Sequence, residues 1–548
     1  MKINKNKKIN TNFIYKIIEK DILKNNSLNI KTRFPPEPNG HLHIGHAKSI
    51  FINFNISKKY LGKCNLRFDD TNPSKEKIKY INSIKKDIKW LGLKWNENIK
   101  YASNYFKIFY KYAMILIKKG LAYVDNLTKN QIRKYRGSLI KEGKNSPFRN
   151  RKIEKNINLF KKMKNGYFKD GSICLRAKIN MKSKIIIMRD PVLYRVIKIK
   201  KHHQTKNKWC IYPTYDFSHC ISDYIEKITH SICTTEFTNN KILYNWILKN
   251  IGTKNRPKQY EFSRLNIENN IISKRKIKKL IKKKIVKNWS DPRLLTISGL
   301  RKRGYTPISI MNFCNYIGVT RKENFIQMSY LEHFIKEDLK NKVKRAMAVL
   351  NPIKIIIYNL PKNYKKIIKI PNHPKIKKFG TQKIVLRKEI YIEKEDFEET
   401  SKNKKKLFIN GKVKLRYSYF IKAKKIKKNK LNKIEKIYCK CYKNIINKKN
   451  KKKKKISIIH WVSIKDSIKT KFKIYKNLFK TKYPEKKKNM IQYIDKKSKK
   501  VKIGFSQKDI LSKILKNYIQ FERIGYFMLN NLKKNKNITF TCITKFKK

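Results

Sequence analysis

Two histidines near the N-terminus, set among prolines and glycines, are the residues best suited to chemistry on phosphate. The stretch Arg33–Ser49 reads RFPPEPNGHLHIGHAKS, between a run typical of a β-strand and one typical of a helix. His43 and His46 are three residues apart, so they share one face of the first helical turn. A helix N-terminus favours anions, and two imidazoles there suit a triphosphate. Gly45 lets a flat ring approach the backbone. Metal binding and ordinary surface histidines are the alternatives.

The elements that would position this motif alternate between strand and helix. Residues 29–34 and 65–68 have the pattern of strands, and residues 44–58 and 75–91 have that of helices. Such alternation up to about residue 250 predicts βαβ units and a parallel sheet. Ligands of such sheets bind at the carboxyl ends of the strands, which is where the two histidines would lie.

The second half of the chain has a different pattern of apolar and polar residues. Residues 265–343 are mostly helical in pattern. Later runs are β-rich and broken by Asn, Pro and Gly, which predicts one or two antiparallel barrels. These runs are residues 353–358, 383–392, 413–423 and 456–462. The lysine-rich tract 448–455 is interpreted as a solvated loop.

Composition limits the classes of partner. The chain has 548 residues, which at roughly 150 per domain predicts about three to five domains. The net charge of +103 fits nucleic acid or anionic membrane, although lysine gained by mutational drift is an equal alternative. No run approaches the roughly 18 apolar residues of a membrane span. The basic N-terminus carries no signal-peptide pattern, and nine scattered cysteines without a C-x-x-C pair predict a reduced, cytosolic protein without structural zinc.

The stretch from His43 to His46 resembles the HIGH motif of class I aminoacyl-tRNA synthetases, and the longer stretch through Ser49 resembles its form in glutaminyl-tRNA synthetases. Ile271–Arg275 takes the place of the family's KMSKS motif and keeps its Ser-Lys pair. Further stretches extend the resemblance over nearly the whole chain. They are LRFDDTNP (66–73), HHQTKNKWCIYPTYDFSHCISD (202–223), ITHSICT (228–234), QYEFSRL (259–265) and FERIGYF (521–527).

The resemblance implies a multidomain protein with an α/β Rossmann-type class I synthetase catalytic domain. The implied parts are a basic lead-in (1–26), the catalytic domain (27–103 and 215–264), an inserted acceptor-stem-binding domain (104–214), a helical connector carrying the KMSKS-like loop (265–343) and two C-terminal antiparallel β-barrels for the anticodon (344–548).

The activity implied by the resemblance is activation of L-glutamine with ATP and transfer of the aminoacyl group to the 3′-terminal adenosine of tRNA(Gln). Mg²⁺ is expected as the partner of the phosphates, with no metal site built from protein ligands alone. His43, His46 and Lys274 are the implied catalytic residues, which would stabilise charge on phosphate oxygens. The implied ATP site comprises Glu37, Pro38, Asn39, His43, Ile44, Gly45, His46, Ala47, Lys48, Ser49, Thr234, Arg264, Leu265, Ile272, Ser273 and Lys274.

The implied glutamine site joins charged groups to a neutral pocket. Asp69, just past a predicted strand, can meet the α-ammonium, although it could instead cap the following turn. Tyr215 offers a hydroxyl to the side-chain amide. Cys233 supplies no counter-charge for a γ-carboxylate, whereas similar glutamyl enzymes place an arginine in that region, so glutamine is favoured. The implied glutamine-binding set is Arg33, Asp69, Tyr215, His219, Cys233 and Gln259.

The remaining predictions concern RNA and the state of the protein. The residues that resemble anticodon readers are Arg345, Lys405, Lys406, Arg416, Gln520 and Arg523. Arginine and glutamine suit the base edges of splayed nucleotides. We expect a cytosolic monomer that binds tRNA(Gln) and no membrane. Two alternatives remain: a glutamyl or non-discriminating enzyme of the same architecture, and an RNA-binding protein that kept the fold and lost catalysis.

Overall fold

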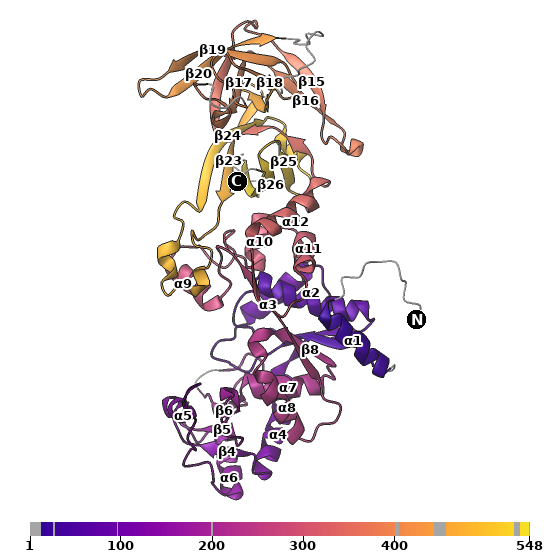
Figure 1. The fold of residues 1–548 in the computed structure, drawn as a ribbon, viewed down its shortest axis with the longest axis vertical. Helices are drawn as coiled ribbons and strands as arrows, with labels where there is room; N and C mark the ends of the chain where they lie inside the picture. Colours follow the sequence, from indigo (N-terminus) through magenta and orange to yellow (C-terminus); the bar gives the residue numbers. More distant parts are fainter. Residues whose placement is uncertain are drawn as a thin grey trace.

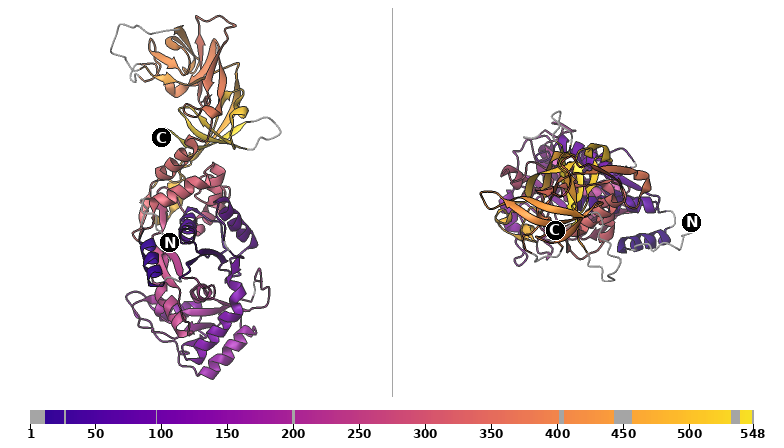
Figure 2. Two further views of the ribbon diagram at one scale, coloured as in Figure 1. Left: turned by 90° about the vertical axis from the view of Figure 1, so that its right-hand side faces the viewer. Right: turned by 90° about the horizontal axis from the view of Figure 1, so that it is seen from above.

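The computed structural model describes residues 12–25, 28–95, 97–198, 201–400, 405–442, 456–530 and 538–546. The molecule is elongated (Figure 1), with the N-terminal half at one end, two large sheets at the other and helices between them. Views from the side and from above show the same succession (Figure 2). The lysine-rich tract 448–455 lies outside the described residues, as do residues 1–11 of the lead-in.

The strand–helix–strand unit predicted around the two histidines is confirmed. Strand β1 (Lys31–Phe34) pairs in parallel with β2 (Lys63–Phe68), and α2 (Ile44–Lys59) connects them. The other elements of this part are α1 (Phe13–Lys24), α3 (Ile78–Trp90), β3 (Lys100–Tyr101), β8 (His230–Thr234) and β9 (Lys258–Phe262). Strands β8 and β9 also pair in parallel, so several strand ends face the same side.

Residues 106–250 form a second packed unit. Its antiparallel sheet has the order β4-β5-β6-β7, and its buried side chains form a cluster that extends to α7, which carries the predicted site residues Tyr215 and His219, and to α8. The elements are α4 (Phe106–Lys118), β4 (Ala122–Asp125), α5 (Lys129–Arg136), α6 (Ile153–Lys164), β5 (Cys174–Ala177), β6 (Val192–Val196), β7 (Ile211–Pro213), α7 (Tyr215–Ile225) and α8 (Asn240–Asn250).

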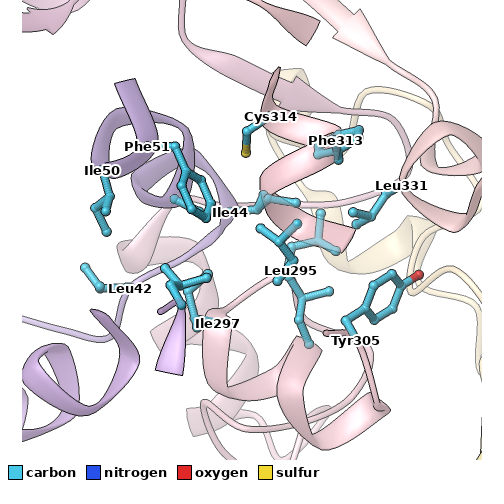
Figure 3. Close-up of a cluster of buried hydrophobic side chains, with 14 of the residues drawn as sticks. Leu42, Ile44, Ile50, Phe51, Leu295, Ile297, Tyr305, Phe313, Cys314 and Leu331 are labelled. Carbon is cyan, nitrogen blue, oxygen red and sulfur yellow. The ribbon is translucent and has the colours of Figure 1, made fainter. Parts of the chain in front are cut away.

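A helical region connects the two ends of the molecule. Its elements are β10 (Leu265–Ile267), α9 (Lys274–Lys282), α10 (Ile297–Arg303), α11 (Pro307–Ile317), β11 (Asn324–Ile326) and α12 (Met328–Lys340). Leu295, Phe313 and Leu331 pack with Ile44 and Phe51 of α2 in one buried cluster (Figure 3). This packing fixes the start of α2, the helix that carries the histidine motif.

The C-terminal part contains two barrel-like sheets of seven strands each, with the orders β12-β25-β26-β27-β23-β24-β13 and β21-β18-β19-β20-β14-β17-β22. The strands of the first are β12 (Arg345–Ala346), β13 (Ala348–Val349), β23 (Ser467–Tyr475), β24 (Lys499–Gln507), β25 (Tyr518–Phe521), β26 (Gly525–Leu529) and β27 (Thr539–Lys545). Those of the second are β14 (Pro352–Ile357), β17 (Glu389–Glu393), β18 (Lys412–Leu415), β19 (Phe420–Lys428), β20 (Ile434–Tyr442), β21 (Ile458–Ile459) and β22 (Trp461–Ser463). A two-stranded ribbon, β15 (Lys366–Pro371) and β16 (Thr381–Leu386), stands beside them.

The prediction of purely antiparallel barrels is wrong in one respect. The pairs β12/β25, β23/β27, β14/β20 and β18/β21 are parallel. Each joins strands that are distant in the sequence, so no hairpin forces them to run in opposite directions. Among the described residues, no helix has the length and apolar character needed to cross a bilayer.

Candidate active site

A cavity of about 630 Å³ lies where strands β1, β2 and β8 end and α2 begins. Most of the predicted site residues line it. Those of the ATP set are Glu37, His43, Gly45, His46, Ser49, Thr234, Arg264, Leu265, Ile272, Ser273 and Lys274. Those of the glutamine set are Arg33, Asp69, Tyr215 and Cys233. The placement agrees with the general rule that open parallel sheets bind ligands at the carboxyl ends of their strands.

The two histidines of the motif lie against each other at the start of α2. The backbone N–H of His43 donates to Nδ1 of His46 over 3.0 Å, and the ring centroids are 3.7 Å apart. A Cβ on Gly45 would lie 3.0 Å from the His43 ring, so the close approach that this glycine permits is made by that imidazole. Burial, and then the neighbouring cations, lower the pKa of both imidazoles well below the ordinary value. Both rings are therefore neutral near pH 7.

Lys274 reaches across the cavity from the first residue of α9. Its Nζ donates to Oδ1 of Asn39 over 2.7 Å. A Cβ on Gly40 would lie 3.1 Å from Cδ of Lys274, so a glycine at this position leaves room for the lysine. Burial lowers the pKa of Lys274 to about 8, and the carboxylate of Glu37 acts in the opposite direction. The lysine is an ammonium group at neutral pH, poised to gain a phosphate partner.

Five residues of the predicted ATP set do not line the cavity: Pro38, Asn39, Ile44, Ala47 and Lys48. Ile44 and Ala47 are buried in the hydrophobic core, where they hold α2 in place. Lys48 donates from Nζ to the carbonyl of Ser263 over 3.0 Å, away from the cavity. Asn39 acts through its contact with Lys274. A sequence motif thus mixes residues that line the cavity with residues that support it.

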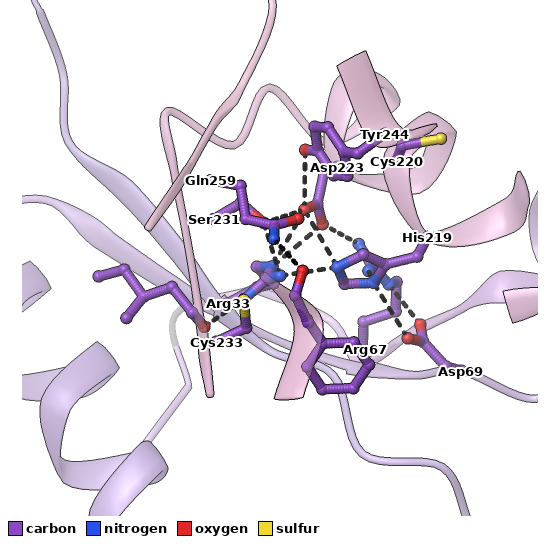
Figure 4. A network of polar contacts seen from close by, with 12 residues as sticks. Arg33, Arg67, Asp69, His219, Cys220, Asp223, Ser231, Cys233, Tyr244 and Gln259 are labelled. Atoms are coloured by element: carbon purple, nitrogen blue, oxygen red, sulfur yellow. Dashed lines mark hydrogen bonds and ion pairs between the residues drawn. The ribbon is translucent and has the colours of Figure 1, made fainter. Parts of the chain in front are cut away.

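A buried ionic network forms the wall around Asp69 (Figure 4). Nε of Arg67 donates to Asp69 over 2.8 Å, and its NH1 reaches Asp223 at 2.9 Å and Glu226 at 3.3 Å. Arg33 also donates to Asp223, over 3.1 Å. Counted by themselves, the two arginines and three carboxylates carry a net charge of −1. Because Asp69 is the carboxylate that lines the cavity, this excess charge favours a cation there.

Arg33 is fully committed to this network, which limits its predicted role. Its NH1 donates to the carbonyl of Ile232 over 2.9 Å, and its NH2 lies 2.7 Å from Oγ of Ser231 and 2.8 Å from Nε2 of His219. The side chain therefore shapes the pocket wall more than it offers a free fork to a carboxylate.

The remaining members of the glutamine set surround a small pocket that Asp216 also lines. The rings of Tyr215 and His219 stack with centroids 4.8 Å apart. Burial raises the pKa of the Cys233 thiol to about 12, so it carries no charge at neutral pH. Gln259 uses its amide internally, donating to Glu261 and to the carbonyl of Phe237, each over 3.0 Å. Gln259 and His219 do not line the main cavity but an adjoining small pocket shared with Tyr215 and Cys233.

Asp70, His202 and His203 form a group of metal-ligating residue types outside the cavity. Nδ1 of His202 faces the backbone N–H groups of Gln204 and Thr205, both at 3.2 Å, so the proton is on Nε2. That proton points at the carbonyl of Asp70, 2.8 Å away. Internal hydrogen bonds therefore occupy both ring nitrogens of His202, so this histidine has no lone pair free for a cation.

The predicted anticodon residues gather near the junction of the two large sheets. Arg345 on β12 is in register with Gln520 on β25. Arg523 forms a two-pronged ion pair with Asp396, both contacts at 2.7 Å. Arg416 pairs with Glu522, the neighbour of Arg523. Lys406 lies 3.4 Å from Glu398, close in sequence to the partner of Arg523, and Lys405 is adjacent. Carboxylates of the chain itself thus hold three of these cations in place.

Arg67, Asp223, Glu226 and Glu485 are site residues that sequence reasoning missed. Arg67 lies near the end of the buried strand β2, and a charged residue in a buried strand needs a partner, so its type was a usable signal. Asp223 lies in one of the stretches that carry the resemblance. Glu485, which contacts the Ile272–Ser273 backbone, carries no signal in its surroundings.

Family models and close relatives cover nearly the whole chain. The catalytic-domain family of class I tRNA synthetases (E and Q) matches residues 29–341, and the two corresponding anti-codon binding domain families match residues 343–442 and 458–530. A glutamine–tRNA ligase of Buchnera aphidicola subsp. Schizaphis graminum is 56% identical over 97% of this chain and 96% of its own length. One of Proteus mirabilis is 49% identical over 97% of this chain and 96% of its own length.

The solved structure of a glutamate–tRNA synthetase from Elizabethkingia anophelis aligns with a TM-score of 0.43 and 19% identity, over 57% of this chain and 71% of that one. The assignment depends instead on the family matches and the two close relatives, both of which span nearly the whole chain. The chain belongs to the class I aminoacyl-tRNA synthetases of the glutamyl and glutaminyl (E and Q) family.

Proposed function

We propose that this chain is a glutamine–tRNA ligase, which activates L-glutamine with ATP and esterifies tRNA(Gln). One observation carries the proposal: a single cavity brings the phosphate-directed groups His43, His46 and Lys274 together with the ammonium-directed carboxylate of Asp69. That combination suits attack by an amino-acid carboxylate on a nucleotide phosphate. Close relatives over nearly the whole chain carry the same activity in their names.

In the first step, a carboxylate oxygen of glutamine bonds to the α-phosphorus of ATP, and the bond to the β-phosphate oxygen breaks. Pyrophosphate leaves, and glutaminyl-adenylate remains. The neutral imidazoles of His43 and His46 donate N–H bonds to phosphate oxygens, and the Lys274 ammonium offsets the growing charge. ATP enters as its Mg²⁺ complex, with the ion held chiefly by the phosphates. In the second step, a terminal adenosine hydroxyl attacks the acyl carbon, the bond between that carbon and the phosphate oxygen breaks, AMP leaves and the hydroxyl proton is released.

Selection of glutamine depends on the two ends of the substrate. Asp69, supported by Arg67, binds the α-ammonium, because the network around it has a net charge of −1. At the other end, Tyr215 and Cys233 offer uncharged groups. A γ-carboxylate there would lose its hydration and find no free cation, because Arg33 is already paired with Asp223, whereas a γ-amide would need only hydrogen bonds.

The rest of the chain handles RNA in this proposal. The sheet β4 to β7 and its helices bind the acceptor stem, the helices from α9 to α12 form a connector, and the two large sheets read the anticodon through the residues near their junction. We keep the cytosolic location and the monomeric state as predictions. Gel filtration with light scattering measures the second.

Parallel charging of a tRNA pool with labelled glutamine and glutamate tests the function. Mg²⁺-ATP is present, and the salt concentration is varied because phosphate contacts weaken with salt. We expect charging of tRNA(Gln) with glutamine only. Charging with glutamate would assign the chain to the glutamyl or non-discriminating alternative. Tight RNA binding without charging would show a protein that has lost catalysis. His46→Ala is expected to reduce turnover far more than glutamine binding, since its partner is phosphate charge.

A further inference from the structure

The backbone beside Lys274 is held by a residue that lies far along the chain. Glu485 belongs to the short 3-10 helix η6 (Pro484–Lys486), in the connection between β23 and β24. Its Oε1 accepts from the N–H of Ile272 over 2.7 Å and from the N–H of Ser273 over 2.9 Å. In Figure 1, this yellow segment descends from the sheets and lies beside α9. Ser273 is the N-cap of α9, and its own side chain makes no capping hydrogen bond. The carboxylate accepts from the N–H of the N-cap residue, as the acidic side chain of a capping box does, and its negative charge lies near the positive end of the helix.

The same carboxylate holds a second group of the cavity. NH2 of Arg264 lies 3.5 Å from Oε2 of Glu485, and NH1 of Arg264 donates to Glu236 over 2.7 Å. The Arg264 guanidinium thus contacts two carboxylates, Glu236 from the first half of the chain and Glu485 from the second. Glu485 itself does not line the cavity, whereas Ile272, Ser273 and Arg264 do. It supports these groups from behind and leaves the space in front of them to a ligand.

The segment that carries Glu485 is held in place by contacts that do not involve the Glu485 side chain. Nδ2 of Asn269 donates to the carbonyl of Thr481 over 2.9 Å, and its backbone N–H donates to the carbonyl of Lys482 over 2.8 Å. The buried side chains of this junction form one apolar cluster. They are Ile271, Ile277, Leu280, Val286, Leu294, Leu478, Phe479 and Met490. Truncation of the Glu485 side chain should therefore leave the segment in place.

We propose that Glu485 is a positioning residue for adenylate formation. It fixes the Ile272–Ser273 backbone and the Arg264 guanidinium, and so fixes the direction from which Lys274 meets the phosphates. Without it, two partly buried N–H groups lose their acceptor and the loop gains alternative conformations, so that the lysine is placed correctly less often. The inference depends on the proposed function, because its readout is the use of ATP.

The test compares Glu485→Ala, Glu485→Gln and a control, Glu435→Ala, which removes an exposed carboxylate on β20. Kinetic constants are measured separately for ATP and glutamine in the full-length protein with tRNA. We expect the KM for ATP to rise roughly tenfold in Glu485→Ala, the size of effect of losing a charge-assisted hydrogen bond. Glu485→Gln keeps an acceptor oxygen and should stay within about threefold of the parent protein. The KM for glutamine should not change, and neither should any constant of Glu435→Ala.

A second arm needs no catalysis. Amide hydrogen exchange, followed by mass spectrometry, should be faster at residues 271–275 in Glu485→Ala and near the parent rate in Glu485→Gln. An unchanged KM for ATP in Glu485→Ala would overturn the inference. Equal rises in the KM for ATP and in the KM for glutamine would also overturn it, and so would a Glu485→Gln variant as impaired as Glu485→Ala. If the parent protein does not charge tRNA with glutamine, the proposed function fails, and the exchange arm still decides whether Glu485 orders the loop.

Discussion

Replacement of Asp69 by asparagine tests how much the negative charge of this side chain contributes to the proposed binding of glutamine. The buried network contains Arg33 and Arg67 against Asp69, Asp223 and Glu226, so its net charge is −1. The substitution keeps the shape of the side chain and brings the net charge to zero. A hydrogen bond to a charged group contributes about 1.5–3 kcal/mol. Since about 1.4 kcal/mol is a factor of ten, the KM for glutamine should rise roughly 10- to 150-fold.

The assay is aminoacylation over a range of glutamine concentrations, with the KM for ATP measured in parallel and expected to stay within about threefold. Inhibition by glutaminol adds a direct control, because this analogue keeps the ammonium group and the side-chain amide and lacks the carboxylate. Its inhibition constant should rise with the KM for glutamine. A raised KM with unchanged glutaminol inhibition would show that Asp69 does not bind the ammonium group, and the charge argument would be refuted.

Three further predictions address other parts of the molecule. Burial lowers the pKa of Lys274 to about 8, so the free enzyme loses this positive charge as the pH rises through 8. The value of kcat/KM for ATP should therefore fall above that pH. In Lys274→Arg, whose side chain stays charged, the pH profile of kcat/KM should be flatter. Asp223→Asn leaves two buried arginines short of a partner and should destabilise the fold by about 3–5 kcal/mol in urea unfolding; a loss below 1 kcal/mol would contradict the network. The arginines hold the pKa of Asp223 below its usual range, so its stabilisation is complete above about pH 4 and is lost as the pH falls further. Arg523→Ala should raise the KM for cognate tRNA about tenfold while the KM for ATP stays constant; an equal loss for tRNA with an altered anticodon would reduce its role to general electrostatics.

Local patterns were enough to predict the elements around the histidine motif. Strand β1, helix α2 and the parallel pairing with β2 follow from alternation of apolar runs and from a Pro/Gly loop, all of which are properties of short stretches. The location of His43 and His46 at a helix start follows from the same stretch. The strand directions in the two large sheets could not be predicted in this way, because the parallel pairs join strands from distant parts of the chain.

The direction of individual side chains was also beyond the sequence. The same sequence motif assigned both Lys48 and Ser49 to the ATP site. In the structure, Ser49 lines the cavity, whereas Nζ of Lys48 donates to the carbonyl of Ser263 on another side of the helix. The partners of Asp69 come from β2 and α7, and only the folded chain brings Arg67 and Asp223 together. Glu485 is the extreme case, since 213 residues separate it from Ile272.

The docking of the 478–490 segment on the catalytic half has a consequence for how the protein is made. Domains generally fold in order of synthesis, N-terminal first. Here, the apolar partners of Ile271, Leu280 and Leu294 include Leu478 and Met490, so this surface stays uncovered until most of the 548 residues have been translated. The Ile271–Lys274 loop of a nascent chain thus lacks the support of Glu485 until most of the chain has been translated. A chain that ends before this segment would expose an apolar surface in place of a finished enzyme, which marks incomplete products for quality control.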